Sequence, residues 1–180
     1  MGRDAEDTLL FTGNMVPRQQ NARLPLFLLL GLLGMVISLH AQPPNLTWAQ
    51  WFEIQHINMA HPQCSDAMQV VNRYRMGMVN RRRMVCKDQN TFLRTTFAEV
   101  AHVCTTENVR CPTSRSMNCH NSSVQVPVTY CNLTRNARRY MDCRYTQTQA
   151  QRIYIIACNN RSPRDNATYP VVPVHLDAII

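Results

Sequence analysis

Lysine is almost absent from this chain of 180 residues. Of nineteen basic residues, eighteen are arginine and one is Lys87. An ammonium group is a compact point charge on a flexible stem, whereas a guanidinium is a wide planar fork. Lys87 is therefore a candidate for a position that requires an ammonium, although one lysine can also be an accident of composition. The net charge of +8 predicts anionic partners such as nucleic acid, acidic lipid or sulfated sugar.

The chain also lacks an apolar run that is comfortably long enough to span a membrane. Its segment from Leu24 to Leu39 is sixteen residues without a charge, preceded by Arg18 and Arg23 and followed by the small residue Ala41. A basic start, a short apolar stretch and a small residue at the end are typical of a secretory signal peptide.

Three parts of the chain follow from this interpretation. Residues 1–14 carry three acids, which is unusual ahead of a signal peptide, so we treat them as an upstream extension of doubtful status. Met15 is an alternative start, and residues 15–41 are the expected signal peptide. Residues 42–180 are then one secreted domain, expected outside the cell, with storage in granules as a further expectation.

Closely spaced Cys and His ligands of the zinc-finger type are missing, and no metal or other cofactor is expected. The chain has eight cysteines, and an even number in a secreted chain favours a disulfide framework. Eight cysteines allow 105 pairings, so spacing alone leaves the connectivity open. Five glycosylation sequons agree with secretion. They begin at Asn45, Asn121, Asn132, Asn160 and Asn166.

Helical patterns occupy the first half of the domain. Thr47 and Gln50 form a capping box before an amphipathic helix over 48–57. A second helix is expected to begin at Ser65, and a third follows a capping box at Thr96 and Glu99. The second helix buries Met68, Val70 and Val71, and the third buries Phe97, Val100, Ala101 and Cys104.

After Cys104 the apolar residues recur with a period of two, which is typical of strands. The expected strands include Val124 to Tyr130, Ile153 to Cys158 and Val171 to Leu176. Helices first and strands later predict an α+β domain with three helices and antiparallel sheet. The short helices bury little, so disulfides of about 2–4 kcal/mol each must supply much of the stability.

An eight-residue duplication precedes Lys87. Residues 71–78 read VNRYRMGM and residues 79–86 read VNRRRMVC. Eight residues would rotate the apolar face of a continuing helix by roughly 80°. We therefore expect a protruding basic loop in 71–86, although displacement of Cys86 and Lys87 is the alternative.

Three groups are candidates for catalysis, and the motifs around them are specific. They are Gln55-His56 after a Trp-Phe-Glu run, Cys86-Lys87 followed by Asn90-Thr91-Phe92, and Pro173-Val174-His175-Leu176-Asp177. Together they resemble the pancreatic-type ribonuclease superfamily. Trp48 to Glu53, with His56 to Met59, is similar to its eosinophil branch, that of eosinophil-derived neurotoxin and eosinophil cationic protein. The other histidines are assigned surface or core roles: His61, His102 and His120.

The resemblance covers residues 42–180 and includes all eight cysteines. It implies a V-shaped α+β fold, a cleft between two lobes, and a monomer that the cytosolic ribonuclease inhibitor could bind. It also implies four disulfides: Cys64–Cys131, Cys86–Cys143, Cys104–Cys158 and Cys111–Cys119.

The activity that the resemblance implies is metal-free cleavage of single-stranded RNA after pyrimidines. His56 would take the proton from the ribose 2′-OH, and His175 would protonate the leaving 5′-oxygen, giving a 2′,3′-cyclic phosphate that is then hydrolysed. Two imidazoles suit this exchange because their ordinary pKa lies near 6.5. Lys87 would stabilise the transition-state charge. Gln55 would bind the phosphate, and Asp177 would fix the imidazole tautomer.

Base recognition is implied for a second group of residues. Thr91 matches the pyrimidine reader, because a hydroxyl both donates and accepts and so fits uracil and cytosine. DNA lacks the 2′-OH nucleophile and should not be cut. Further substrate contacts are implied for Asn90, Asn118 and Leu176. Asn159 stands where the eosinophil branch usually has Asp, which affects the site for the base on the 3′ side.

A second functional class remains open. The arginines of the duplication, interleaved with Met and Val, would suit a cationic host-defence protein that binds anionic membranes or sulfated glycans without needing catalysis. An arginine run is also compatible with a merely solvated face. The two classes differ in whether activity survives His175→Ala.

Overall fold

The computed structural model describes residues 42–76 and 85–180. Residues Ala41–Ile180 form one compact unit. The expected signal peptide, the upstream extension and the centre of the duplication, 77–84, lie outside the described residues. Within the described part of the chain, no helix combines the length and the apolar character needed to cross a membrane.

In the described residues, three α-helices lie close to where the sequence predicts them, two of them after the predicted capping boxes. They are α2 (Trp48–Phe52), α3 (Cys64–Met76) and α4 (Phe97–Val103). Thr47 and Gln50 form a reciprocal capping box at α2, and Thr96 and Glu99 form another at α4. The first helix differs from the prediction in its second half, because it continues as the π-helical turn η2 (Glu53–Ile57).

In the part of the chain that the structure describes, six strands form two antiparallel sheets of three strands each, with the orders β1-β3-β4 and β2-β5-β6. The α+β fold is thereby confirmed. The strands are β1 (Gln89–Leu93), β2 (Cys119–Asn121), β3 (Val126–Arg135), β4 (Arg144–Arg152), β5 (Tyr154–Asn160) and β6 (Val171–Ile179). Val124 was expected in a strand, and this is wrong: it lies in the loop before β3, with 67% of its surface exposed.

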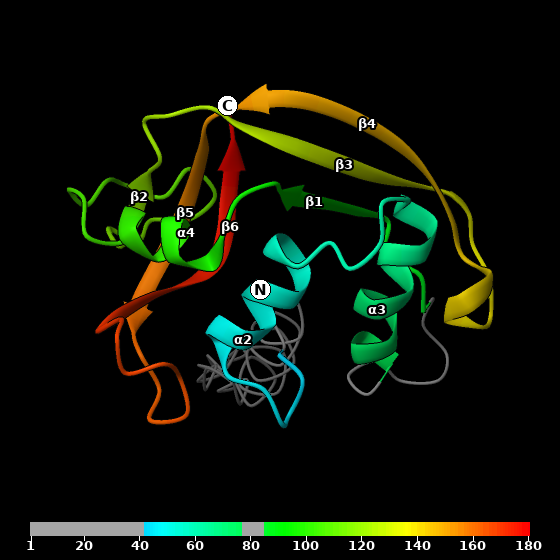
Figure 1. Cartoon of the computed structure of the whole chain (residues 1–180), viewed down its shortest axis with the longest axis horizontal. Coiled ribbons are helices and arrows are strands. Elements are labelled where there is room, and N and C mark those ends of the chain that lie inside the picture. The colour runs from blue at the N-terminus through cyan, green and yellow to red at the C-terminus, as the bar shows by residue number, and fades with distance from the viewer. Residues whose placement is uncertain (1–41, 77–84) are drawn as a thin grey trace, which may run out of the picture. The chain divides into compact units, whose positions relative to one another are not determined.

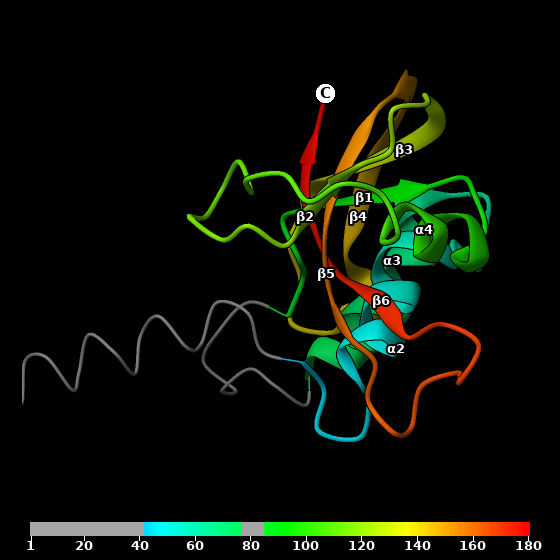
Figure 2. The same cartoon turned by 90° about the vertical axis from the view of Figure 1, so that its left-hand side faces the viewer.

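The helices are placed around the two sheets. Figure 1 shows α2 in the middle of the unit, between α3 and strands β5 and β6. Figure 2 shows the three α-helices on the same side of β2 and β5. Helix α2 contacts β6, η2 contacts β1, and α3 contacts β4. Helix α2 therefore contacts the sheet β2-β5-β6, and η2, which follows it directly, contacts the sheet β1-β3-β4.

The core has two main apolar clusters, and adjacent residues of α2 and β1 divide between them. Trp51 belongs to the cluster under α3, whereas Phe52 belongs to the cluster under α4. On β1, Phe92 and Leu93 divide in the same way, because successive side chains of a strand point to opposite faces. The segments that carry the candidate site are therefore anchored in both clusters.

All eight cysteines are paired, in the four pairs that the resemblance implies. The pairs are Cys64–Cys131, Cys86–Cys143, Cys104–Cys158 and Cys111–Cys119. Three of them close separations of 54 to 67 residues and join distant elements. By constraining the unfolded chain, bridges of this kind stabilise a small domain by about 2–4 kcal/mol each.

Candidate active site

The three residues proposed for catalysis come from three separate elements. His56 lies on η2, Lys87 precedes β1, and His175 lies on β6. The packing of η2 on β1 and of α2 on β6 brings them together. The charges of Lys87 and His175 both act on the imidazole of His56. The structure thus unites residues that are 119 positions apart in the sequence.

The His56 imidazole is held in one orientation by β1. Its Nδ1 lies 2.8 Å from the backbone oxygen of Thr91. A carbonyl oxygen can only accept, so Nδ1 carries a proton and Nε2 is the basic nitrogen of the neutral ring. The ring also contacts Phe52, with centroids 5.2 Å apart.

The surroundings of His56 favour its neutral form. Burial lowers its pKa to about 3, and the charges of Lys87 and His175 act in the same direction. The hydrogen bond to Thr91 raises the pKa of His56, but by less than the other effects lower it. The ring is thereby kept neutral in mild acid, which is the form that can accept a proton.

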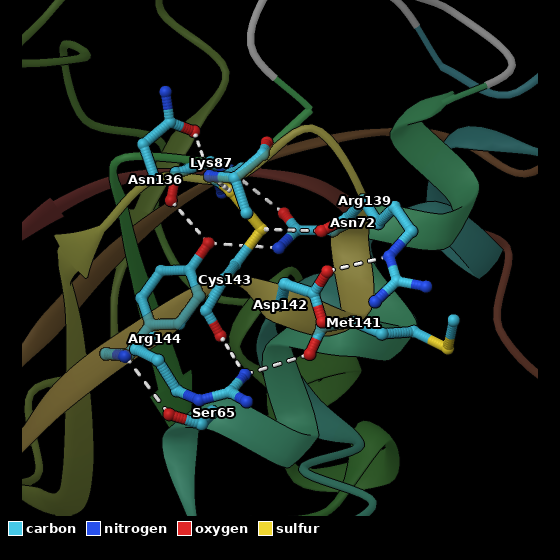
Figure 3. The surroundings of a disulfide bond; sticks show 12 residues. Ser65, Asn72, Lys87, Asn136, Arg139, Met141, Asp142, Cys143 and Arg144 are labelled. Carbon is cyan, nitrogen blue, oxygen red and sulfur yellow. Dashed lines mark hydrogen bonds and ion pairs between the residues drawn. A yellow bond between two sulfur atoms is a disulfide. The ribbon is translucent and has the colours of Figure 1, made fainter.

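The backbone of Lys87 is fixed by a closed hydrogen-bond network. Its N–H donates to Asn72 Oδ1 at 2.9 Å, and its carbonyl accepts from the Tyr145 hydroxyl at 2.8 Å. Asn72 Nδ2 donates to that hydroxyl at 3.0 Å, which closes the loop. Figure 3 shows Asn72 and Lys87 beside Cys143, the partner of Cys86. The lysine next to Cys86 is thus held by α3, β4 and a disulfide.

The Lys87 side chain joins the same site. Its Nζ donates to Asn90 Oδ1 at 2.6 Å, and Asn90 Nδ2 donates to the Gln55 backbone oxygen at 2.7 Å. Asn90, expected to contact substrate, therefore links Lys87 to the segment that carries His56. The Gln55 contact uses its backbone, whereas the predicted phosphate contact would use its side chain.

Two effects lower the pKa of the Lys87 ammonium. Burial lowers the pKa of Lys87 to about 7, and the guanidinium of Arg75 acts in the same direction. Arg75 lies on α3, one turn after Asn72. An ammonium with this pKa would gain charge stabilisation when a phosphate enters the site.

His175 is more open to solvent than the other two groups. Its side chain is 41% exposed, and its Nε2 lies 4.0 Å from Asp177 Oδ1. The Asp177 side chain is only 3% exposed. The carboxylate accepts from the backbone nitrogen of Thr113 at 3.0 Å and from its hydroxyl at 2.5 Å. Asp177 is therefore near the imidazole but bonded to Thr113.

The residues expected to bind the bases lie on three strands and a loop. Thr91 is a half-buried residue of β1, and Leu176 is a half-buried residue of β6 that packs on the second core cluster. Asn118 Nδ2 donates to the Cys158 backbone oxygen and to Asn159 Oδ1, each at 3.0 Å. The two asparagines form one unit at the end of β2.

The remaining histidines and the sequons lie elsewhere. His61 and His102 are exposed. His120 is a buried residue whose Nδ1 lies 3.0 Å from the Thr106 oxygen, which is a structural role. Among the sequons, Asn121 and Asn132 are half-buried. The exposed ones are Asn45, Asn160 and Asn166.

Sequence reasoning missed the residues that support the site. Asn72 and Tyr145 hold Lys87, and Thr113 holds Asp177. Asn72 follows the buried Val71 on α3 and has no exposed surface. A polar residue at an apolar helix position was a usable signal, because such residues are nearly always hydrogen-bonded when buried.

The geometry agrees with the comparison to known families. The family model described as pancreatic ribonuclease matches residues 47–177. The chain belongs to the pancreatic ribonuclease family. It is an endoribonuclease, and its substrate is RNA.

Proposed function

We propose that this protein is a secreted endoribonuclease that cleaves single-stranded RNA after pyrimidines, without a metal, through a 2′,3′-cyclic phosphate. The observation that carries the proposal is the His56 imidazole, which is held through Nδ1 by the Thr91 carbonyl and on which the charge of Lys87 acts. This arrangement supports a base next to a cation, which is what an attack on a phosphodiester requires.

The first step moves one proton to His56. Nε2 takes the proton of the ribose 2′-OH while the oxygen forms a bond to phosphorus. The bond from phosphorus to the 5′-oxygen breaks, and His175 gives that oxygen a proton. Asp177 lies on the Nε2 side of His175, which favours the opposite nitrogen, Nδ1, as the donor. The products are a cyclic phosphate and a free 5′-hydroxyl.

The second step reverses the roles of the two histidines. His175 takes a proton from water, and the water oxygen forms a bond to phosphorus. The bond from phosphorus to the 2′-oxygen breaks, His56 gives that oxygen its proton, and a 3′-phosphate remains. Lys87 serves both steps, because its ammonium faces charge that grows on the nonbridging oxygens. The network of Asn72 and Tyr145 supports this role by fixing the lysine backbone.

Pyrimidine preference is assigned to Thr91. Its backbone oxygen already binds His56, so a base read by its hydroxyl would lie close to the reacting ribose. A hydroxyl can donate to one base and accept from another, which supports a site open to both uracil and cytosine. Asn90, Asn118 and Leu176 remain proposed substrate contacts.

The test uses protein purified from mammalian cells that express the full chain. We expect cleavage of poly(U) and poly(C), weak cleavage of poly(A), and a cyclic phosphate detected by 31P NMR. His56→Ala and His175→Ala should each abolish cleavage, whereas His102→Ala, at an exposed position outside the site, should not. Loss of activity in EDTA would contradict the metal-free reaction, and equal cleavage of poly(A) would contradict the pyrimidine preference.

Secretion and host defence are part of the same proposal. The apolar segment 24–39 and the five sequons support export, and the net charge supports action on anionic targets. Mass analysis of protein from the culture medium should give an N-terminus near residue 42. A product that stays in the cells would contradict export.

A second candidate function is binding of sulfated glycans through a basic segment. The segment from the last residue of β3 to the first residue of β4, residues 135–144, carries a single acid, Asp142, which pairs with Arg139 at 2.7 Å. Four arginines of this segment are exposed: Arg135, Arg138, Arg139 and Arg144. Binding to a heparin column should survive His175→Ala and weaken in Arg135→Ala/Arg138→Ala. Anionic vesicles form the parallel test of a membrane target.

A further inference from the structure

The loop closed by the Cys111–Cys119 disulfide contains none of the proposed catalytic residues, but it lies next to one of them, His175. Cys119 of β2 and His175 of β6 both pair with Ala157 of β5, one on each side. Both sulfurs of this disulfide lie within 4.8 Å of each other and of a carboxylate oxygen of Asp177. The loop is therefore packed directly against the carboxylate that neighbours His175.

Thr113, in this loop, binds both oxygens of Asp177. Its backbone N–H donates to Oδ2 at 3.0 Å, and its hydroxyl donates to Oδ1 at 2.5 Å. The oxygen nearest to His175 is the same Oδ1, at 4.0 Å from Nε2. The Thr113 hydroxyl lies within hydrogen-bond distance of Oδ1, whereas the His175 imidazole lies too far from Oδ1 for a hydrogen bond. Thr113 and His175 thus share one carboxylate oxygen.

We propose that Thr113 is a positioning residue for His175, which acts by holding the Asp177 carboxylate and limiting its attraction for the imidazole. A carboxylate that accepts two hydrogen bonds has its charge partly satisfied and attracts an imidazolium less strongly. Because the Asp177 side chain is 3% exposed, water has little access to take the place of the hydroxyl.

Two further neighbours of His175 act differently. His56 of η2 interacts with it electrostatically, and its partner on β5, Ala157, does not titrate. Asp177 is the carboxylate that Thr113 controls. By holding Asp177, the hydroxyl limits how firmly this carboxylate holds the protonated form of His175. The catalytic consequence rests on the proposed function, whereas the contact itself does not.

The test is an NMR titration of 13C-labelled histidine in protein purified from mammalian cells that express the full chain. The His175 signal is assigned by its loss in His175→Asn. Thr113→Val keeps the backbone N–H and removes the hydroxyl. The freed Oδ1 should hold the imidazolium more strongly and raise the His175 pKa by about half a pH unit or more. Thr113→Ser keeps the hydroxyl and should leave the pKa as it is.

Ser114→Ala is the matched control from the same loop, because the Ser114 hydroxyl accepts from the Ser116 backbone and does not bind Asp177. If Thr113→Val does not fold, Thr113→Ala removes the same hydroxyl without placing an extra methyl group there. An unchanged His175 pKa in the folded hydroxyl-free variant would overturn the proposal.

Enzyme kinetics separate this proposal from the proposed function. The alkaline limb of kcat/KM for RNA cleavage should move to higher pH in Thr113→Val, together with the pKa measured by NMR. If the pKa moves and the wild-type protein does not cleave RNA, the positioning role stands and the proposed function fails. If RNA is cleaved and the pKa does not move, the positioning role fails alone.

Discussion

The side chain of Asn72 and the backbone of Lys87 are joined by a hydrogen bond of 2.9 Å. The two residues flank most of the duplicated segment, and the next residue inward, Cys86, is bonded to Cys143. Both ends of the segment are thus attached to the fold. The charge of Lys87 still acts on His56 although an extra eight residues precede the lysine.

The first prediction concerns this bond. Asn72→Ala leaves the Lys87 N–H and the Tyr145 hydroxyl without their buried partner, which should cost about 1–3 kcal/mol in the free energy of unfolding. It should also lower kcat/KM for RNA, because the lysine is no longer fixed. Chemical denaturation and initial rates measure the two effects.

Gln69→Ala is the control for Asn72→Ala. Gln69 lies on the same helix, and its side chain contacts Asp66 in an exposed pair at 3.4 Å. Its loss should change stability by no more than about 0.5 kcal/mol and leave kcat/KM unaltered. Wild-type kcat/KM in a folded Asn72→Ala protein would show that Lys87 does not depend on this bond.

The capping boxes explain why the helices could be predicted from the sequence. Thr47 and Thr96 each bind a backbone N–H within their own turn, so the signal is local. Strand β4 was missed because most of its residues are polar. It is held by pairing with β3 along most of its length, a contact that no local pattern records.

The same distinction applies to the site. His56, Lys87 and His175 stood out through their motifs, and the structure brings them together. Asn72 and Thr113 did not stand out, because their roles depend on partners 15 and 64 residues away. A hydrogen bond across the fold leaves no periodic trace in the sequence.

The second prediction concerns pH and His56. The neutral form must be present for proton abstraction, and burial lowers the pKa of His56 from its ordinary 6.5 to about 3. The acid limb of kcat/KM should therefore lie below 6.5. Initial rates on a dinucleotide substrate across pH 3 to 8 measure it. A limb at or above 6.5 would show that the folded protein does not favour the neutral ring.

The lowered pKa of His56 also links pH to stability. In the unfolded chain His56 takes up a proton as the pH falls below 6.5, whereas the folded chain resists this until about pH 3. The unfolded state thus binds more protons in this window, and stability falls as the pH decreases through it. His56→Gln should reduce this dependence, which denaturation at several pH values would measure.

The third prediction concerns Arg75 and Lys87. Burial lowers the pKa of Lys87 to about 7, and the charge of Arg75 is the second cause of this shift. Arg75→Gln removes a positive charge that acts on the ammonium, so the pKa of Lys87 should rise. NMR titration of 13C-labelled lysine measures this pKa directly, because Lys87 is the one lysine of the chain. Arg73→Gln changes the same charge at an exposed position of α3 and should raise this pKa less. An equal rise in both variants would indicate a general charge effect.

The fourth prediction compares two disulfides that join distant elements. Cys86–Cys143 and Cys64–Cys131 close separations of 57 and 67 residues. From loop entropy alone, removing either should cost about 4 kcal/mol of stability. Both bridges belong to the same core cluster, so Cys64→Ala/Cys131→Ala is a matched control for Cys86→Ala/Cys143→Ala.

The two double variants should differ in activity. Cys86 directly precedes Lys87 in the chain, and Figure 3 shows Lys87 beside the disulfide. Without this bridge, the hydrogen bonds of the Lys87 backbone to Asn72 and Tyr145 have to hold the segment that carries the ammonium. At a temperature where both variants are folded, kcat/KM should fall further without Cys86–Cys143. An equal fall in both would mean that the bridge acts on Lys87 through global stability rather than through position.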